Sequence, residues 1–160
     1  MKIGVISDTH DDIELAGKAA DFFEEEVETV IHCGDMVAPF TAELFDRDFD
    51  FYAVRGNNDG EWNLKETVEE FGSFENNILE LEVEGLSIAV YHGTEEEIVE
   101  GLVRKNYDYV FRGHTHERGK REYSGTTEVN PGGIELPSQE EGFSVAVLDT
   151  RDQSISFKEF

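Results

Sequence analysis

The segment VFRGHTHERG, residues 110–119, places two of the chain's five histidines on either side of one threonine. The apolar run at 107–111 that leads into it predicts a buried strand. In an extended chain, side chains at positions i and i+2 point to the same side. His114 and His116 are therefore expected to face one common site at a strand end. This feature favours a fold that gathers ligand side chains along one edge of a sheet.

Four other predicted strands end in the same way, with metal-ligand side chains and several glycines. The complete set of candidate ligands is Asp8, His10, Asp35, Asn57, His92, His114 and His116. Ligands in open α/β sheets collect at the carboxyl ends of strands, and glycine there permits tight turns and close backbone approach. Seven donors are too many for one ion and suit two.

The donor types limit the choice of metal. Imidazole nitrogen mixed with carboxylate and amide oxygen favours Mn, Fe, Zn, Co or Ni over Ca or Mg. We expect two divalent ions, with manganese first and nickel, cobalt, iron or zinc as alternatives. A carboxylate such as Asp35 can bridge two ions that lie about 3.5–4 Å apart. The single cysteine, Cys33, excludes an internal disulfide and a cysteine-based zinc site.

Hydrophobic periodicity predicts one α/β domain, residues 1–160, with early β-α-β units and a β-rich second half. Strands are predicted at 2–7, 28–32, 50–54, 78–83, 86–91, 107–111, 120–124, 126–130, 143–149 and 154–159. Helices are predicted at about 12–27, 39–45, 62–70 and 94–105. Asp11 or Asp12 would cap the first helix, and a capping box of Thr94 and Glu97 would open the last. Two sheets packed face to face with helices outside are expected.

The charge of the chain is strongly negative: 37 acidic residues against 13 Lys and Arg give −24 at pH 7. Such a field repels nucleic acid and anionic membranes, so neither is an expected partner. No apolar run reaches the length of a transmembrane helix, and the first residues predict a strand rather than a signal peptide, which indicates a cytoplasmic protein. Spread acid with only six lysines favours adaptation to a high-salt cytosol over an acidic partner-binding block.

The motifs D-x-H (8–10), G-D (34–35), G-N-x-D (56–59), H-G (92–93) and G-H-x-H (113–116) occur in this order, each after a predicted strand. Together they resemble the signature of the calcineurin-like metallophosphoesterases. The short chain without a cap domain is similar to the small phosphodiesterases of bacteria and archaea. The resemblance implies a four-layered α-β-β-α sandwich of two mixed sheets. It also implies in-line hydrolysis of a small phosphoester by a hydroxide that bridges two metals.

The resemblance also implies roles for single residues. One ion would be held by Asp8, His10 and His116, the other by Asn57, His92 and His114, with Asp35 bridging the two. Asp35, His92 and His114 would be catalytic through the metals. Asn57, Asn58 and Arg55 are candidates for substrate binding, although Arg55 and Arg112 are expected to pair with carboxylates instead. His32 is expected to be buried behind the site, and Asp59 either orients a neighbour or makes an Asx turn.

One position departs from part of the family, in which a histidine follows G-N and helps to protonate the leaving group. Asn58 stands there, and asparagine is no general acid near neutral pH. Activated, aryl or cyclic diesters are therefore the expected substrates. Two alternatives stay open: a phosphomonoesterase or nucleotide phosphatase on the same site, and a non-catalytic protein-binding scaffold of the same fold. Relatives are often dimers or tetramers, so a homo-oligomer is possible.

Overall fold

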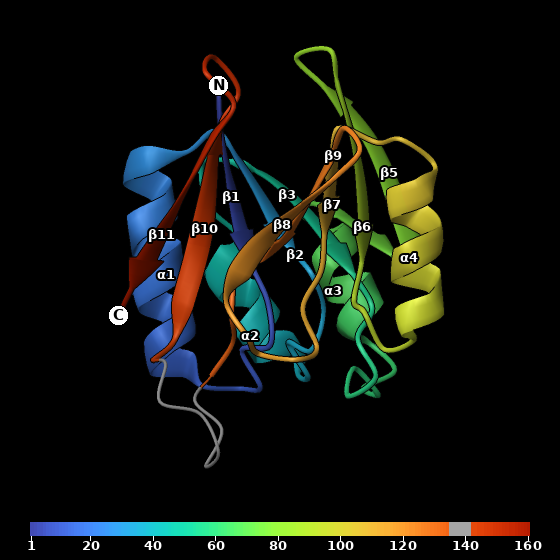
Figure 1. The fold of residues 1–160 in the computed structure, drawn as a ribbon. Coiled ribbons are helices and arrows are strands. Elements are labelled where there is room, and N and C mark those ends of the chain that lie inside the picture. Colours follow the sequence, from blue (N-terminus) through green and yellow to red (C-terminus); the bar gives the residue numbers. More distant parts are fainter. Residues whose placement is uncertain (135–141) are drawn as a thin grey trace.

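The computed structural model describes residues 1–134 and 142–160, and its core is two mixed β-sheets stacked on one another (Figure 1). The six-stranded sheet has, from edge to edge, β11 (Ser154–Glu159), β10 (Ser144–Asp149), β1 (Lys2–Ile6), β2 (Thr29–His32), β3 (Asp50–Val54) and β4 (Ser73–Glu75). The five-stranded sheet has β5 (Ile78–Val83), β6 (Leu86–Tyr91), β7 (Tyr109–Phe111), β9 (Thr126–Asn130) and β8 (Gly119–Tyr123).

Helices cover the outer face of each sheet (Figure 1). They are α1 (Ile13–Glu26), α2 (Pro39–Ala42) with a 3-10 turn η1 (Glu43–Phe45), α3 (Leu64–Glu69) and α4 (Glu96–Arg104). The first three helices pack on the six-stranded sheet and α4 packs on the five-stranded one. None of the helices in the described residues is long and apolar enough to cross a membrane.

The side chains of β1 alternate between the two faces of the sheet and pack it against both neighbouring layers. Ile3 and Val5 are fully buried between the two sheets, where they share a cluster with Ile88 and Phe111 of the other sheet. Gly4 points to the opposite face, and a Cβ there would lie 2.5 Å from the ring of Phe23 in α1. Period-two alternation therefore sends alternate side chains of β1 into two separate apolar cores.

The predicted fold is confirmed: two mixed sheets are flanked by helices in four layers. The sequence analysis missed β4, which has three residues and pairs only with β3. The predicted helix at 39–45 is a short α2 that tightens into η1. These differences lie at short elements and at element ends, where a hydrophobic pattern carries the least information.

The two predicted helix caps had different outcomes. Asp12 caps α1, because its carboxylate accepts a hydrogen bond from the N–H of Leu15 at 3.0 Å. The predicted capping box of α4 is wrong, since the N-cap residue is Glu95, which makes no side-chain cap bond. The hydroxyl of Tyr91 bonds both the N–H and the carboxylate of Glu95 and fixes where the helix begins.

The topology places the candidate ligands along one edge of the sandwich. β1, β2 and β3 are parallel to one another, as are β6, β7 and β9, so their carboxyl ends share an edge. Figure 1 shows this edge below β1, on the side where α2 lies. Every candidate ligand lies in a loop that leaves one of these strands.

Candidate metal centre

The loops after β1 and β2 are joined by their backbones before any side chain is considered. The N–H of Asp8 donates to the carbonyl of Gly34 at 2.9 Å, and the N–H of His10 donates to the carbonyl of Asp35 at 3.0 Å. These two bonds continue the parallel pairing beyond the strands. As a result the D-x-H and G-D motifs lie against one another.

The first group of donor atoms belongs to Asp8, His10 and His116. Oδ1 of Asp8 lies 3.3 Å from Nε2 of His116 and 3.7 Å from Nε2 of His10. Asp8 is fully buried, and within the described part of the chain neither its Oδ1 nor Nε2 of His10 has a hydrogen-bond partner. Buried polar atoms are nearly always paired, so this convergence of unpaired donors fits a bound cation.

The second group contains Asp8, Asp35 and His92. Oδ2 of Asp35 lies 3.3 Å from Nε2 of His92 and 3.6 Å from Nε2 of His10. The side-chain oxygen of Asn57 lies 3.0 Å from the same Nε2 of His92. Asp35 thus lies between the His10 side and the His92 side of the site, as a bridging ligand must.

His114 is the one candidate histidine that joins neither compact group among the described residues. Its ring meets the ring of His92 edge to face, with centroids 5.2 Å apart, and its backbone N–H donates to Oδ2 of Asp8 at 2.9 Å. The structure therefore brings His114 to the centre through its main chain and its ring contact with His92.

Two of the histidines have the ring orientation that metal ligands require. Nδ1 of His92 donates to the carbonyl of Cys33, and Nδ1 of His116 donates to the carbonyl of Ile134, each at 2.8 Å. In a neutral ring this leaves the lone pair on Nε2, which in both residues faces the candidate site. A ligating histidine almost always donates its other ring N–H to a carbonyl, carboxylate or water.

Backbone strain is concentrated at the ligands. A positive φ is uncommon outside glycine, and its clustering is typical of functional sites, where it re-aims side chains that the regular backbone would point elsewhere. Five of the seven candidate ligands have it: Asp8 (53°), His10 (42°), Asp35 (60°), His114 (70°) and His116 (58°).

The motif glycines leave room for the ligands. A Cβ at Gly56 would lie 2.1 Å from Oδ1 of Asp35, and one at Gly113 would lie 2.4 Å from Oδ2 of Asp8. Both distances are shorter than any real non-bonded contact, so no larger residue fits without displacing a candidate ligand. This close approach is the physical reason for glycine in the G-N and G-H motifs.

Asn58 and Asp59 hold Asp35 from two sides. The N–H and the side-chain amide of Asn58 each donate to one carboxylate oxygen of Asp35 at 2.8 Å. Asp59 accepts hydrogen bonds from the backbone N–H of Asp35 and of Gly56. It therefore orients a neighbour, which is one of the two roles predicted for it. The sequence analysis did not foresee the hold of Asn58 on Asp35. The two residues are 23 positions apart, and no local sequence signal indicates that they meet.

The two arginines have different surroundings. Arg112 pairs with Glu96 at 2.7 Å and with Glu128 at 3.5 Å, which confirms the predicted carboxylate pairing. Arg55 instead donates to the carbonyl of Asp59 and to the side chain of Asn76, and it lies over the ring of Phe74. Its predicted pairing with a carboxylate is wrong within the described residues. Its predicted contact with substrate stays a prediction.

The charges of the site support one another. Burial alone would raise the pKa of Asp8, but its interactions with His10 and His116 outweigh burial and hold that pKa well below the usual range. Likewise, burial is outweighed at Asp35 by its contact with His92, and the pKa of Asp35 is lowered. Asp8 and Asp35 are therefore ionised at neutral pH, as metal ligands must be. At His114, burial and the neighbouring His92 lower the pKa.

His32 lies behind the ligands, as predicted. It is fully buried, and burial lowers its pKa to about 3, so it is neutral at physiological pH. Its Nδ1 accepts from the N–H of Gly34 at 3.1 Å, which leaves the proton on Nε2 to be donated to the hydroxyl of Thr9 at 3.2 Å. A neutral imidazole thus ties the Gly34 loop to the loop between Asp8 and His10.

The Asp and His groups suit a dinuclear centre for divalent metal ions, with nitrogen and oxygen donors and no thiolate. Asp8 belongs to both groups, and Asp35 reaches toward histidines of both sides.

Comparison with known proteins agrees with this geometry. The family model for the calcineurin-like phosphoesterase superfamily domain matches residues 1–153. A phosphodiesterase of Methanocaldococcus jannaschii is 40% identical over 140 residues, which cover 82% of this chain and 83% of the relative. A probable metallophosphoesterase of Bacillus subtilis, YsnB, is 30% identical over 99% of this chain and 89% of its own.

Solved structures give the same result. A structure described as a novel archaeal phosphodiesterase superposes with a TM-score of 0.92 and 34% identity, covering 100% of both chains. Vps29 from Entamoeba histolytica superposes with a TM-score of 0.73 at 18% identity, covering 99% of this chain and 97% of its own, which indicates a shared fold alone. On the family match and the 40% identity, the chain belongs to the calcineurin-like phosphoesterase superfamily.

Proposed function

We propose that the protein is a metal-dependent phosphoric ester hydrolase that acts on phosphodiesters. One observation carries the proposal: the buried Oδ1 of Asp8, which has no hydrogen-bond partner among the described residues, converges with Nε2 of His10 and Nε2 of His116. In a protein of this superfamily, such a cluster is best explained as the ligand set of a hydrolytic metal centre.

In this proposal two ions share the ligands. One would be held by Asp8, His10 and His116, the other by Asn57, His92 and His114, and Asp35 would bridge the pair. When bound, the ions supply Lewis acidity, lower the pKa of water toward neutrality and offset charge on the phosphoryl oxygens. Asp35, His92 and His114 are catalytic through this centre.

The residues of the chain then orient the substrate and the ligands. Asn58 fixes Oδ1 of Asp35 with its backbone N–H and Oδ2 with its side-chain amide, so it acts on the bridging carboxylate and donates no proton to the leaving group. Asn57 and Asn58 are both exposed, and their side chains lie beside His92 and Asp35. Asn57, Asn58 and Arg55 are therefore proposed to contact the substrate.

The preference for diesters is supported in two ways. The relative from Methanocaldococcus jannaschii and the 34% identical solved archaeal protein are both described as phosphodiesterases. Without a general acid at position 58, esters with good leaving groups are expected to react fastest. Aryl and cyclic diesters meet that condition better than alkyl monoesters.

Manganese is the metal that we propose first, with nickel, cobalt, iron or zinc as alternatives, since nitrogen and oxygen ligands accept all of these ions. We further propose that residues 1–160 act as one catalytic domain, that the protein works in a high-salt cytoplasm, and that it can form dimers or tetramers. A net charge of −24 supports the high-salt setting and disfavours a nucleic-acid partner.

The test is hydrolysis of bis-(p-nitrophenyl) phosphate and of p-nitrophenyl phosphate by metal-stripped protein in molar KCl, with and without added Mn²⁺. We expect turnover only with the metal, and faster turnover of the diester. Metal binding is measured on the same samples by calorimetry.

Each other outcome points to a different conclusion. Faster hydrolysis of the monoester would favour a phosphatase on the same site. Failure to hydrolyse either ester, together with failure to bind metal, would favour a non-catalytic scaffold and contradict the proposal.

A further inference from the structure

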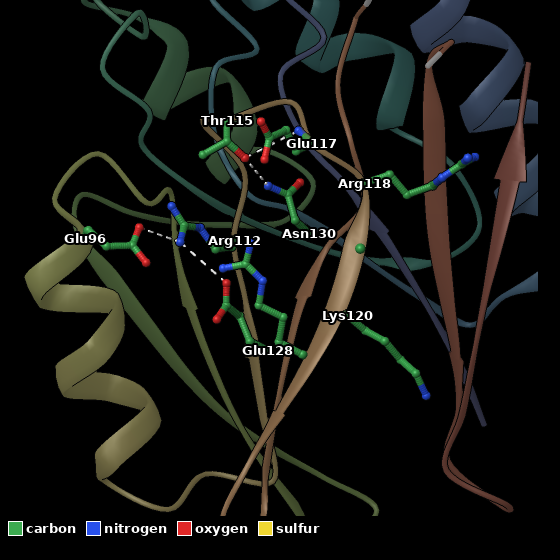
Figure 2. Close-up of a pocket in the computed structure, with 10 residues that line it drawn as sticks. Glu96, Arg112, Thr115, Glu117, Arg118, Lys120, Glu128 and Asn130 are labelled. Atoms are coloured by element: carbon green, nitrogen blue, oxygen red, sulfur yellow. Dashed lines mark hydrogen bonds and ion pairs between the residues drawn. The ribbon is translucent and has the colours of Figure 1, made fainter. Parts of the chain in front are cut away.

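Arg112 is a buried cation that does not belong to the candidate ligand set. It lies between β7 and the turn that carries His114, and it is only 4% exposed. Figure 2 shows it with Glu96 and Glu128 at the wall of a pocket of about 340 Å³, beside α4. Among the described residues that line this pocket, none is a candidate metal ligand. Arg112 therefore lines a pocket that is separate from the candidate ligands.

Its guanidinium reaches three acceptors on three different elements. Nη1 lies 2.7 Å from Glu96 at the start of α4 and 3.5 Å from Glu128 of β9. Nη2 donates to the carbonyl of Gly93 at 3.2 Å, directly after His92. Arg112 is the first residue after β7, and its side chain thus joins the turn after β7 to the turn after β6.

The backbone strengthens this link between the two turns. The N–H of Gly113 donates to the carbonyl of His92 at 2.9 Å, and the carbonyl of Gly113 accepts from the side chain of Asn130 at 3.1 Å. Figure 2 shows Asn130 next to Thr115 at the same wall of the pocket. The two turns that carry His92 and His114 are therefore fixed to one another by contacts that involve no ligand side chain.

We propose that Arg112 is a positioning residue that locks the His92–Gly93 turn to the Gly113–His114 turn. It would thereby set the geometry of the half-site made by Asn57, His92 and His114. This inference rests on the proposed metal centre, and it concerns one of its two ions.

The geometry requires arginine in particular. The planar guanidinium presents several donors in a fixed arrangement, whereas a lysine ammonium is a single point charge on a flexible stem. The guanidinium lies close against Gly93, where an added Cβ would be 3.0 Å from Nε and 3.1 Å from Nη2. Glycine at position 93, with φ of +105°, allows both the turn and this contact.

Apart from the bond that the N–H of His114 donates to Oδ2 of Asp8 at 2.9 Å, the other half-site is held by different contacts. His116 is oriented by the carbonyl of Ile134, and Asp8 and His10 are bonded through their backbones to the loop after β2. Arg112 contacts none of these groups in the described structure. Loss of Arg112 is therefore expected to weaken the ion of the His92 half-site much more than the other.

The experiment compares Glu128→Gln with the double variant Arg112→Met plus Glu128→Gln. Removing Arg112 alone would leave Glu128 as a buried, uncompensated charge, which by itself can unfold a protein. The two chosen variants share a neutral residue at 128 and differ only in Arg112. Arg104→Met, which breaks an exposed pair with Glu100 on α4, is the matched control for loss of one arginine.

The readouts are Mn²⁺ binding by calorimetry and the electron paramagnetic resonance spectrum of the loaded protein. Thermal unfolding of the metal-free variants checks that each is folded. We expect two ions per chain for the parent, the Glu128→Gln variant and the Arg104→Met control. For the double variant we expect one ion of nearly unchanged affinity, a second weakened by about 10- to 100-fold, and loss of the spin-coupled pair signal.

Two results would overturn the inference while leaving the metal centre in place. One is equal binding of both ions by the double variant and by Glu128→Gln. The other is an equal loss of affinity for both ions, which would indicate general loosening rather than positioning of one half-site. A parent protein that binds no ion pair would instead contradict the proposed function, and the inference with it.

Discussion

The carboxylate of Asp59 accepts a hydrogen bond from the backbone N–H of Asp35 at 2.9 Å. The same side chain also accepts from the N–H of Gly56 and the N–H of Val37, each at 2.7 Å. It is 2% exposed, and burial raises its pKa. One buried side chain after β3 thus fixes the backbone of the loop after β2, and with it the direction of the proposed bridging carboxylate.

Asp59→Asn is expected to impair the centre without touching a ligand. The amide offers one accepting oxygen, while its NH₂ group would face a backbone N–H that needs an acceptor. Leaving such a donor unpaired costs about 1–3 kcal/mol, and a lost contact behind a metal ligand typically costs 10- to 100-fold in affinity or activity. Metal titration and thermal unfolding measure the two effects.

The exposed Asp152 provides the control for this substitution. Its carboxylate accepts from the N–H of Ser154 at 3.0 Å in the β10–β11 turn, far along the chain from the ligands. Asp152→Asn is expected to leave metal affinity unchanged. If both substitutions behave alike, the hold of Asp59 on the Asp35 loop has no functional role.

Asp35→Asn is expected to abolish turnover while the protein stays folded. The substitution removes the charge that lies between Nε2 of His10 and Nε2 of His92, 3.6 and 3.3 Å away. Circular dichroism reports the fold, and diester hydrolysis with Mn²⁺ reports activity. The control is Asp48→Asn, the same substitution at an exposed aspartate, which should keep its activity. Parent-like activity of Asp35→Asn would contradict the bridging assignment.

The layers of the fold and the ligand types could be predicted from the sequence. Buried strands appear as short apolar runs, and parallel strands share one carboxyl edge, so residues as distant as Asp8 and His116 were expected together. The start of α4 could not be predicted, because the contact of Tyr91 with Glu95 overrides the Thr94 capping signal. Tertiary contacts decided this boundary.

The supporting contacts of the centre were also beyond sequence reasoning. The hold of Asn58 on Asp35 depends on a loop in which Asp35 has φ of 60°, and no periodicity encodes that conformation. Arg112 illustrates the same limit. Its predicted carboxylate pairing is correct, but its bond to the carbonyl of Gly93 depends on how two turns meet.

Gly56→Ala and Gly60→Ala form a matched pair in one loop. A Cβ at Gly56 would lie 2.1 Å from Oδ1 and 2.3 Å from the backbone nitrogen of Asp35, whereas a Cβ at Gly60 meets no atom within 4 Å. Displacing a catalytic group by about 1 Å can cost roughly 100-fold in rate. We expect a loss of this order for Gly56→Ala and parent-like kinetics for Gly60→Ala. Equal activities would show that Asp35 tolerates displacement.

Asn58→His is expected to change the dependence of the rate on the leaving group. A histidine can protonate a departing alkoxide, so poor leaving groups should gain relative to aryl esters. The bond from the Asn58 amide to Oδ2 of Asp35 is lost, while the backbone bond to Oδ1 remains possible. Absolute rates should therefore fall for aryl diesters. A series of diesters of graded leaving-group pKa measures the slope, and an unchanged slope would contradict the general-acid argument.

Salt is expected to stabilise the folded chain. At −24, the compact state suffers self-repulsion that screening relieves, because the Debye length shrinks from about 10 Å at 0.1 M to about 3 Å at 1 M. The unfolding temperature should rise with KCl. Glu25→Lys, which reverses an exposed charge on α1, should flatten that rise. Sucrose, which carries no charge, should change the unfolding temperature of the parent and of the variant equally. Insensitivity of both proteins to KCl would rule out adaptation to high salt.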